Sequence, residues 1–358
     1  MKKILVICPY PENKAPSQRL KYEQYFPAFR KHGYVLTVAP FINESFWNIA
    51  YKPGNFILKL VNFLYAYWKR LILLVKIARF DIVYIHLWVT PVGPPFFEWL
   101  VRSLARRIIY DIDDLVYLRN EKSGKWYVNL LKGRQKPKYL IKRADHVITC
   151  TPYLDAFAKT LNPVTTDISS TIDTEKYLPV NCYTNDKILN LGWSGSFSTV
   201  RYLRLLQPVL AELSQHIKFR LLVMGDSGFE MPGVDVESVE WTQENEIPFL
   251  QRIDIGLYPL PLDEEWVYGK SGLKALQYMA LGIPTIATAI GTNFRIMEHN
   301  VSGLLVTTQD DWLAAILRLA NDPGLRERMG KCGRRNVEDN FSLHANTGKY
   351  LRILGEQP

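Results

Sequence analysis

The sequence predicts an α/β protein built from two doubly wound, Rossmann-like domains. Short apolar runs, each of the length of a buried strand, recur along the chain, and the segments between them are long enough for helices. Strands that alternate with helices in this way form parallel sheets with both faces covered. A chain of 358 residues is also long enough for two domains that each bury a core.

The first half of the chain begins with the apolar run at residues 3–8, which we interpret as a buried strand. A proline-rich loop follows, and then a helix is expected at residues 19–31. The later strands of this half are predicted at residues 34–40, 81–86, 106–113 and 146–150.

The second half repeats the pattern, with strand-like runs at residues 188–195, 219–225, 253–260 and 283–291. The stretch at 166–187 is polar and rich in turn residues, so it separates the halves. We expect a first domain at 1–167, a linker at 168–187, a second domain at 188–335 and a C-terminal helix at 336–358. One interpretation is that the C-terminal helix packs back on the first domain. Domains facing each other across a cleft would hold ligands beyond the carboxyl ends of the strands.

The net charge of +9 is compatible with three classes of partner, namely nucleic acid, an anionic membrane surface and phosphorylated small molecules. The four cysteines are widely separated, which predicts neither a zinc site nor a disulfide framework and fits a reducing cytosol. The first apolar run is too short for the core of a signal peptide. We therefore expect a cytoplasmic protein.

The segment Gly269-Lys270-Ser271 has the letters that end a P-loop. A P-loop also needs a glycine five residues before its second glycine, directly after a strand, and here that position is Glu264. Prolines and carboxylates precede it, and the carboxylates would repel a polyphosphate. The P-loop interpretation is rejected.

The same segment has the pattern of a helix N-terminus. Gly272 is followed by Leu273, Leu276 and Ala280, at helical spacing, before Gly282 and a proline end the helix. Unpaired amides, the positive end of the helix dipole and a nearby lysine can together bind an anion. The alternative is an ordinary capped helix with a solvated lysine.

Residues 270–306 resemble the donor-site signature of the retaining glycosyltransferases of family 4, which have the GT-B arrangement of two Rossmann domains. The resemblance implies that the helix start binds the diphosphate of a nucleotide-sugar through its amides. Members of that family hold the sugar and ribose with two glutamates eight positions apart. Gly269 and Gln277 stand there in this chain, as in a branch without the usual pair. Gln277 can still bind a ribose hydroxyl, and Asp263, Glu264 or Glu265 can supply the carboxylate.

A second resemblance covers residues 191–203, where the family carries an arginine and a lysine that contact the donor phosphates. Ser196 stands in place of the arginine and Arg201 in place of the lysine, so Lys270 could supply the other cation. The alternative for Arg201 is a solvated residue in the first turn of a helix. The expected donor-binding residues are Gly195, Ser196, Arg201, Lys270, Ser271, Gly272, Leu273 and Gln277.

Three carboxylates, Asp111, Asp113 and Asp114, end a predicted strand of the first domain. Asp-x-Asp is the metal signature of the other main glycosyltransferase fold, but in a paired Rossmann fold these residues need no metal, and no metal or other cofactor is expected. Asp111 and Asp113 are predicted to share one side of the strand. Asp113 or Asp114 would meet the acceptor hydroxyl or the transferred sugar; helix capping or pairing with arginines is the alternative.

The expected catalytic residues are therefore Asp113, Asp114 and Lys270, and the expected acceptor-side residues are Asp111, Ser17 and Arg19. Ser17 and Arg19 are included because they open the first predicted helix. His86 follows a strand, and we interpret it as a core or surface histidine.

Residues 56–80 combine dense apolar content with lysines and arginines. The charges interrupt the segment too often for a membrane-spanning helix. Two interpretations remain, namely peripheral contact with an anionic membrane at the inner face of the plasma membrane and a helix with one buried face.

The sequence as a whole predicts transfer of a sugar, with retention, from a nucleoside-diphosphate sugar to a hydroxyl of a glycan or lipid-linked acceptor. Synthesis of cell-surface glycans or polysaccharides is the expected context. The alternatives are a nucleotide-sugar epimerase of the same fold and a non-catalytic basic binding protein. A nucleic-acid partner is not expected, because no module with clustered basic and exposed aromatic residues is present.

Overall fold

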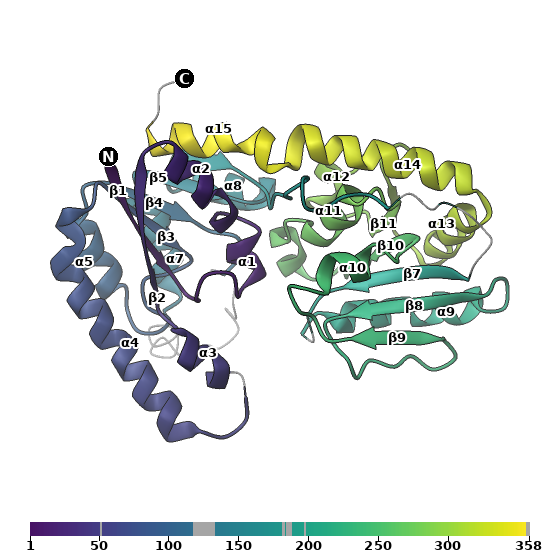
Figure 1. The fold of residues 1–358 in the computed structure, drawn as a ribbon, viewed down its shortest axis with the longest axis horizontal. Coiled ribbons are helices and arrows are strands. Elements are labelled where there is room, and N and C mark those ends of the chain that lie inside the picture. The colour runs from purple at the N-terminus through teal and green to yellow at the C-terminus, as the bar shows by residue number, and fades with distance from the viewer. Residues whose placement is uncertain (51, 117–132, 181–182, 184–187, 197, 356–358) are drawn as a thin grey trace. The chain divides into compact units, whose positions relative to one another are not determined.

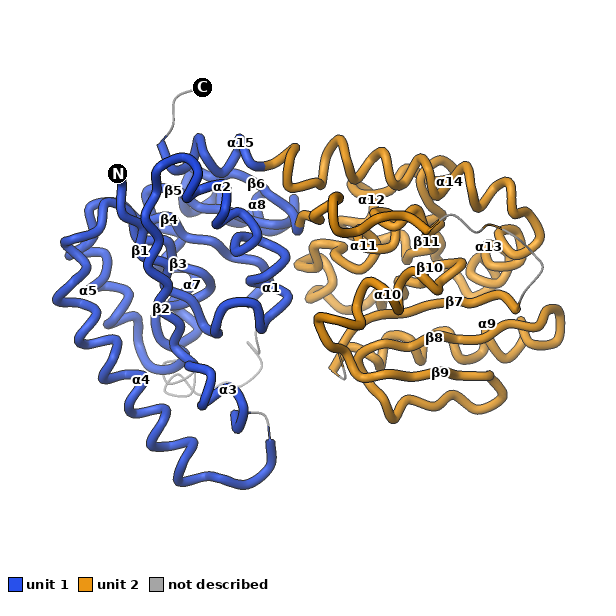
Figure 2. The backbone as a smooth tube through the Cα atoms, in the orientation of Figure 1, with its two compact units in different colours: residues 1–170, 347–358 blue, residues 171–346 orange. Residues whose placement is uncertain are grey.

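The computed structural model describes residues 1–50, 52–116, 133–180, 183, 188–196 and 198–355. The described chain divides into two compact units, coloured separately in Figure 2. Unit 1 contains residues Met1–Ser170 and Thr347–Pro358, and unit 2 contains Thr171–Asn346. Each unit is an α/β body around a six-stranded parallel sheet. The prediction of two doubly wound, Rossmann-like halves is confirmed.

The sheet of unit 1 has the strand order β2-β1-β3-β4-β5-β6. The strands are β1 (Lys2–Cys8), β2 (Tyr34–Pro40), β3 (Ile82–His86), β4 (Ile108–Asp111), β5 (His146–Thr149) and β6 (Thr165–Asp167). The order reverses at β1, so the carboxyl ends of β1 and β3 form the switch point at which doubly wound sheets bind ligands.

Helices surround this sheet, and Figure 1 shows α4 and α5 next to each other beside it. They are α1 (Pro16–Arg19), α2 (Phe26–Lys31), α3 (Glu44–Ala50), α4 (Phe56–Lys76), α5 (Phe96–Leu104), α7 (Gln135–Arg143), α8 (Pro152–Lys159) and the end of α15 (Leu343–Leu354), with 3-10 turns at Glu23–Tyr25 and Ile77–Arg79.

Two predictions for unit 1 are wrong in their boundaries. The single helix predicted at residues 19–31 is divided, because α1 ends at Arg19 and α2 begins only at Phe26. Pro27 lies in the first turn of α2, where a residue without an amide hydrogen starts a helix but cannot continue one. The strand predicted at 106–113 ends at Asp111, so Asp113 lies beyond it in a loop.

The sheet of unit 2 has the order β12-β11-β10-β7-β8-β9. Its strands are β7 (Leu189–Ser194), β8 (Phe219–Met224), β9 (Val236–Val239), β10 (Ile255–Tyr258), β11 (Thr285–Thr288) and β12 (Leu304–Val306). Its α-helices are α9 (Gln207–Leu213), α10 (Glu246–Leu250), α11 (Leu273–Ala280), α12 (Asn293–Ile296), α13 (Gln309–Asn321), α14 (Pro323–Asn336) and the start of α15, with 3-10 helices at Val200–Leu206 and Glu265–Gly269 and a π-helix at Val337–Phe341.

The packing of α11 on β10 depends on a glycine. A Cβ atom at Gly256 would lie 2.5 Å from the ring of Tyr278, which is fully buried. The Tyr278 hydroxyl in turn accepts a hydrogen bond of 2.7 Å from the amide of Ser194, at the end of β7. This hydrogen bond holds α11 against the carboxyl end of β7.

No helix among the described residues is both long and apolar enough to cross a membrane. Cys8, Cys150 and Cys332 are free thiols, and Cys182 lies outside the described residues.

Candidate functional site

The N-cap of α11 is Gly272, so no side chain caps the start of this helix. This residue is the N-cap with φ of 75°, a left-handed conformation that favours glycine, and a Cβ atom here would lie 2.4 Å from Ile296 Cδ1. The first amides of a helix have no partner within the helix, and Gly272 has no side chain to cap them. They and the positive end of the helix dipole attract anions. Residues Glu265–Gly269 just before form a 3-10 helix and not a strand followed by a P-loop.

Lys274, in the first turn of α11, was not among the predicted site residues. Its ammonium lies 4.4 Å from the ring centroid of Trp193 and 5.8 Å from that of Tyr258, and it donates a hydrogen bond of 3.4 Å to Thr199 Oγ1. No carboxylate of the described residues forms an ion pair with it. Burial lowers the pKa of Lys274 to about 7, and the nearby charge of Lys270 contributes. Among the residues that the structure describes, the Lys274 ammonium therefore has no carboxylate as its counterion.

The loop after β7 lies against this lysine. A Cβ atom at Gly195 would be 2.2 Å from the Trp193 ring and 2.8 Å from Lys274 Nζ. A Cβ at Gly225 would be 2.1 Å from the carbonyl oxygen of Gly195. Because both residues lack a Cβ atom, the backbone of Gly195 packs against Gly225 on one side and against the side chains of Trp193 and Lys274 on the other.

Ser196 adds hydroxyl groups next to Gly195. Its amide donates a hydrogen bond of 3.1 Å to Thr199 Oγ1, and its hydroxyl lies 2.9 Å from that of Ser198 and 3.2 Å from that of Thr199. Thr199 Oγ1 is also the acceptor for Lys274. The structure therefore brings the predicted residues Gly195 and Ser196 together with Lys274, Gly272 and Leu273.

Arg201 is 64% exposed and forms an ion pair with Glu264, one of the three carboxylates predicted to replace the missing glutamate of the donor site. Its Nη2 lies 3.1 Å from Glu264 Oε2, and the Tyr202 hydroxyl donates to the same oxygen at 3.1 Å. The Nζ atom of Lys270 lies 5.1 Å from the ring centroid of Trp266. Ser271 lies between Lys270 and Gly272, the N-cap of α11. Arg201 thus has a carboxylate partner in this conformation, whereas Lys274 has none within the described part of the chain.

Gln277 is buried, with 4% of its surface exposed, in a polar network of unit 2. Its amide donates to the Tyr177 hydroxyl at 2.9 Å and to Glu246 Oε1 at 3.2 Å, and Trp241 Nε1 donates to the same oxygen at 2.9 Å. A glutamate at position 277 would place a second carboxylate beside buried Glu246, which is unfavourable for like charges. The neutral amide is the side chain that this network accommodates, and contact with ribose remains a prediction.

Asp111 is fully buried in unit 1, at the end of β4. Its carboxylate forms an ion pair with Lys21 and accepts a hydrogen bond from the Tyr84 hydroxyl. Lys21 Nζ also donates to the carbonyl of Ile112 at 3.2 Å. These contacts fix the start of the loop that carries the other two carboxylates. Direct contact of Asp111 with an acceptor remains a prediction, and it would require this buried group to become accessible.

Asp113 and Asp114 are half-buried in the loop after β4. The Cys150 thiol donates to the carbonyl oxygen of Asp113 at 3.0 Å, and Asp114 Oδ1 accepts from the amide of Leu115 at 3.0 Å. The shared strand side predicted for Asp111 and Asp113 is wrong, because β4 has ended before Asp113. The loop continues into residues outside the described part of the chain.

Ser17 and Arg19 are half-buried in α1, which has only four residues and begins with Pro16 at its first position.

His86 is fully buried at the end of β3, and burial lowers its pKa to about 4, so it is neutral at pH 7. The interpretation of His86 as a core histidine agrees with this position.

Neither a metal-binding cluster nor the hollow found in unit 2 provides a second candidate site among the described residues. Within the described residues, no group of His, Cys, Asp and Glu side chains is arranged to hold a metal ion. A hollow of about 230 Å³ in unit 2 is lined by residues 251–254 and 281–284, which precede β10 and β11. Ligands of doubly wound sheets bind at the opposite, carboxyl ends of strands.

The paired Rossmann-like units and their parallel sheets define the fold of the GT-B glycosyltransferases. Sucrose-phosphate synthase from Thermosynechococcus elongatus matches with a TM-score of 0.69 and 18% identity over 99% of both chains. The Anabaena protein Alr3699/HepE, solved in complex with UDP-glucose, matches with a TM-score of 0.69 and 13% identity over 99% of both chains. These likenesses concern the fold.

The family match lies in unit 2. Residues 189–322 match the family described as "Glycosyl transferases group 1". The D-inositol 3-phosphate glycosyltransferase of Salinispora arenicola is 36% identical over 87 residues, which are 24% of this chain and 19% of that protein. The lipopolysaccharide core biosynthesis glycosyltransferase LpsD of Rhizobium meliloti is 39% identical over 75 residues, which are 20% of this chain and 22% of that protein. The matches span about a fifth of the length of these curated relatives. The sequence similarity supports a glycosyltransferase domain at residues 189–322.

Proposed function

We propose that the protein is a retaining glycosyltransferase that moves a sugar from a nucleoside-diphosphate sugar to a hydroxyl group of a glycan or lipid-linked acceptor. The observation that carries this proposal is Lys274, a lysine without a carboxylate partner in the described structure, beside the uncapped start of α11. The match of residues 189–322 to a glycosyltransferase family supports the same conclusion.

The proposed chemistry requires neutralisation of the leaving diphosphate. When the bond between the sugar and the diphosphate breaks, negative charge develops on the phosphate oxygens. The ammonium groups of Lys274 and Lys270 and the first amides of α11 supply positive charge and hydrogen-bond donors without a metal ion. Because these groups are fixed before the reaction, little reorganisation is needed.

Lys274 is suited to a diphosphate rather than to a permanent protein partner. Its ammonium is flanked by the faces of Trp193 and Tyr258, which stabilise a cation only modestly. A bound diphosphate would restore the full charge of the lysine and gain a charge-assisted hydrogen bond. We expect Arg201 to exchange its exposed partner Glu264 for a phosphate oxygen when donor binds.

The acceptor side of the proposal involves Asp113 and Asp114, with Ser17 and Arg19 as further contacts. A carboxylate at the acceptor hydroxyl would orient it for attack and accept its proton. Attack from the face that the diphosphate leaves gives retention without a covalent intermediate on the protein. No cofactor is required by this scheme.

The proposal is tested by titrating the full chain with nucleoside diphosphates and the matching monophosphates, in calorimetry. We expect one nucleoside diphosphate to bind at least about tenfold more tightly than its monophosphate, because the second phosphate reaches the cations. Lys274→Met should abolish this preference, whereas Lys218→Met, an exposed lysine directly before β8, should preserve it.

Turnover is tested with a panel of nucleotide-sugars, with and without glycan or lipid-linked acceptors, by measuring release of the nucleoside diphosphate. Release that depends on acceptor supports transfer. An epimer formed from the donor alone would show an epimerase instead, and absence of any preference for diphosphates would exclude the proposed donor site.

A further inference from the structure

The solvent side of α4 is apolar along its whole length. Ile57, Val61, Leu64, Trp68, Leu71 and Val75 are all exposed, and their spacings of four and three residues place them on one face of the helix. Val75 is 82% exposed and Ile57 77%. The opposite side carries Ala66 and Arg70, which are buried. A helix on the surface of a protein in water normally has the reverse arrangement, because its polar side faces the solvent.

The apolar surface continues onto α5, which lies next to α4 in Figure 1. Phe96 and Trp99 are each 53% exposed, and their rings are stacked with centroids 6.4 Å apart. A contiguous patch of this kind on a folded protein marks a surface that contacts an apolar partner.

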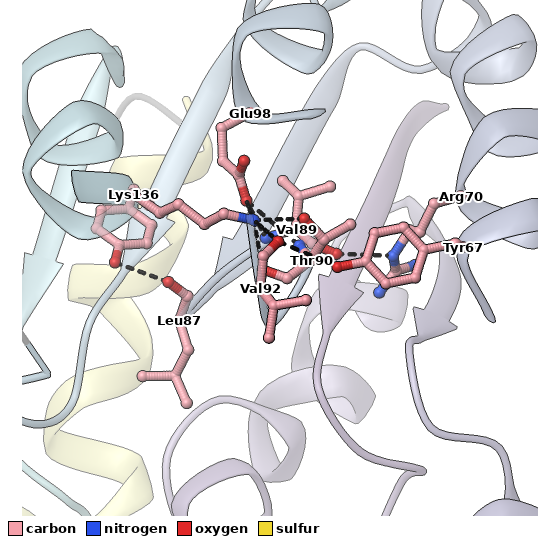
Figure 3. A network of polar contacts seen from close by, with 9 residues as sticks. Tyr67, Arg70, Leu87, Val89, Thr90, Val92, Glu98 and Lys136 are labelled. Atoms are coloured by element: carbon pink, nitrogen blue, oxygen red, sulfur yellow. Dashed lines mark hydrogen bonds and ion pairs between the residues drawn. The ribbon is translucent and has the colours of Figure 1, made fainter. Parts of the chain in front are cut away.

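Buried contacts hold α4 in this orientation. The Arg70 guanidinium donates to the carbonyl oxygens of Val89 at 2.9 Å, Ala39 at 2.8 Å and Cys8 at 3.1 Å, and so ties α4 to β1, β2 and the segment after β3. The Tyr67 hydroxyl adds a bond to Val92 O at 3.1 Å (Figure 3). Rotation of α4 about its axis would break these hydrogen bonds and leave the carbonyl oxygens of Val89, Ala39 and Cys8 without the Arg70 donor.

The charge on this surface has one sign. No aspartate or glutamate occurs between Glu44 and Asp81, while α4 and the turn after it carry the exposed cations Lys69, Lys76 and Arg79. Lys69 lies over the ring of Tyr65, at 5.5 Å from its centroid.

The carboxylate of α5 does not change this sign. Glu98 is fully buried and pairs with Lys136 at 3.3 Å, as Figure 3 shows. It also accepts hydrogen bonds from the amides of Val89 and Thr90. It therefore stabilises the segment after β3 and does not contribute negative charge to the outer face.

We propose that α4 and the start of α5 form a docking surface for the headgroup region of an anionic lipid bilayer. The helix lies in the plane of the interface, its apolar stripe reaches the boundary of the acyl chains, and its lysines meet the anionic headgroups. Trp68, Tyr65 and Trp99 are the side chains that favour this boundary. No described helix is long and apolar enough to span the bilayer, which is consistent with docking on its surface.

Charge favours a bilayer over a second copy of the chain. The apolar spacing of α4 would also suit a helix pair, but such a pair would bring the two sets of lysines together without a carboxylate on either helix to pair with them. Anionic lipid supplies the missing opposite charge.

The test uses flotation of the full chain with vesicles of phosphatidylethanolamine and phosphatidylglycerol, and with vesicles of phosphatidylcholine alone. We expect binding to the anionic vesicles only. The double variant Leu64→Glu, Val75→Glu should lower the bound fraction by about tenfold or more, and Lys69→Gln, Lys76→Gln should weaken the binding and reduce its sensitivity to salt. The double variant Val164→Glu, Val301→Glu alters two exposed valines that belong neither to α4 nor to α5, and it should bind as wild type does.

Sedimentation velocity without lipid completes the test, and thermal unfolding verifies that each variant is folded. If wild type does not bind anionic vesicles but forms a dimer that Leu64→Glu, Val75→Glu disrupts, the surface is an interface between copies and the proposal is wrong. Equal binding by wild type and the folded Leu64→Glu, Val75→Glu variant would overturn it as well. Neither result bears on the proposed donor site, which lies in unit 2.

Discussion

The ammonium group of Lys274 lies 4.4 Å from the centroid of the Trp193 ring, between the carboxyl end of β7 and the first turn of α11. A Cβ atom at Gly195 would touch both side chains. A cation is therefore held at the end of a strand, against an aromatic face and a helix start, without a carboxylate of the described residues. This relationship leads to the first three predictions.

Binding of a nucleoside diphosphate should weaken as the pH rises above 7. In the free protein the pKa of Lys274 is about 7, and a bound diphosphate raises it, so binding at higher pH must take up a proton. We expect the dissociation constant to rise by up to about tenfold per pH unit between pH 7 and the pKa of the complex. Calorimetry in buffers with different enthalpies of ionisation measures the proton uptake. Lys274→Met should remove both the slope and the uptake, and a slope retained in this variant would assign the titration to another group.

The contribution of Lys274 to the stability of the unliganded protein should change with pH in the opposite direction, increasing above pH 7. The pKa of this lysine is lowered from 10.5 to about 7 on folding, so between these values the unfolded chain binds more protons than the folded one. Its contribution to the free energy of unfolding therefore rises with pH from about 7 to 10.5, and below pH 7 its full penalty is present. Urea unfolding should show Lys274→Met more stable than wild type at pH 6, with a difference that shrinks toward pH 10. A constant difference would contradict this account.

Gly195→Ala should weaken binding of the nucleoside diphosphate and destabilise the protein by about 1–3 kcal/mol. The new methyl group would overlap the rings and ammonium that lie against Gly195, so either Trp193 or Lys274 must move. Gly228→Ala is the matched control, because the nearest atom to its Cβ is Asp226 Oδ1 at 3.7 Å. Urea unfolding and calorimetry on both variants check the prediction, and equal behaviour of the two would refute it.

Lys270→Ala and Arg201→Ala should each lower kcat/KM strongly, by about tenfold or more, with little change in stability. The Arg201–Glu264 pair is exposed, so its loss should cost less than about 1 kcal/mol in unfolding. Release of nucleoside diphosphate from the donor measures turnover. Arg252→Ala, which breaks an exposed pair with Glu237, is the control and should keep full activity. Wild-type rates in the first two variants would falsify their proposed role.

Lys21→Met should destabilise unit 1 by about 3–5 kcal/mol, because it leaves the buried Asp111 carboxylate without its counterion. Lys21→Met combined with Asp111→Asn should recover part of this loss, since the uncompensated charge is then removed. Urea unfolding of wild type, both single variants and the double variant gives the coupling energy. Additive effects of the two substitutions would show that the pair is not coupled.

Local sequence patterns were sufficient for part of the molecule. The alternation of apolar runs predicted two parallel α/β units, because strand and helix periodicities are properties of short segments. The helix start at Gly272 followed from glycine chemistry and helical spacing, and Glu264 was enough to exclude a P-loop. Boundaries were less accurate where one residue decided them, as with Pro27 at the start of α2.

Only the tertiary structure revealed the environment of each charged group. In sequence, Lys274 is a lysine four positions after Lys270, and that pair around Gly272 was the available signal. Its contacts with Trp193 and Tyr258 come from strands distant in sequence. The pairing of Arg201 with Glu264 and the burial of Asp111 against Lys21 also join segments that are far apart in the chain. The sequence by itself determined which segments form strands and helices, because those preferences act over a few residues. The fold decided which side chains lose water and which gain a partner, because burial and pairing depend on segments that meet only after the chain has packed.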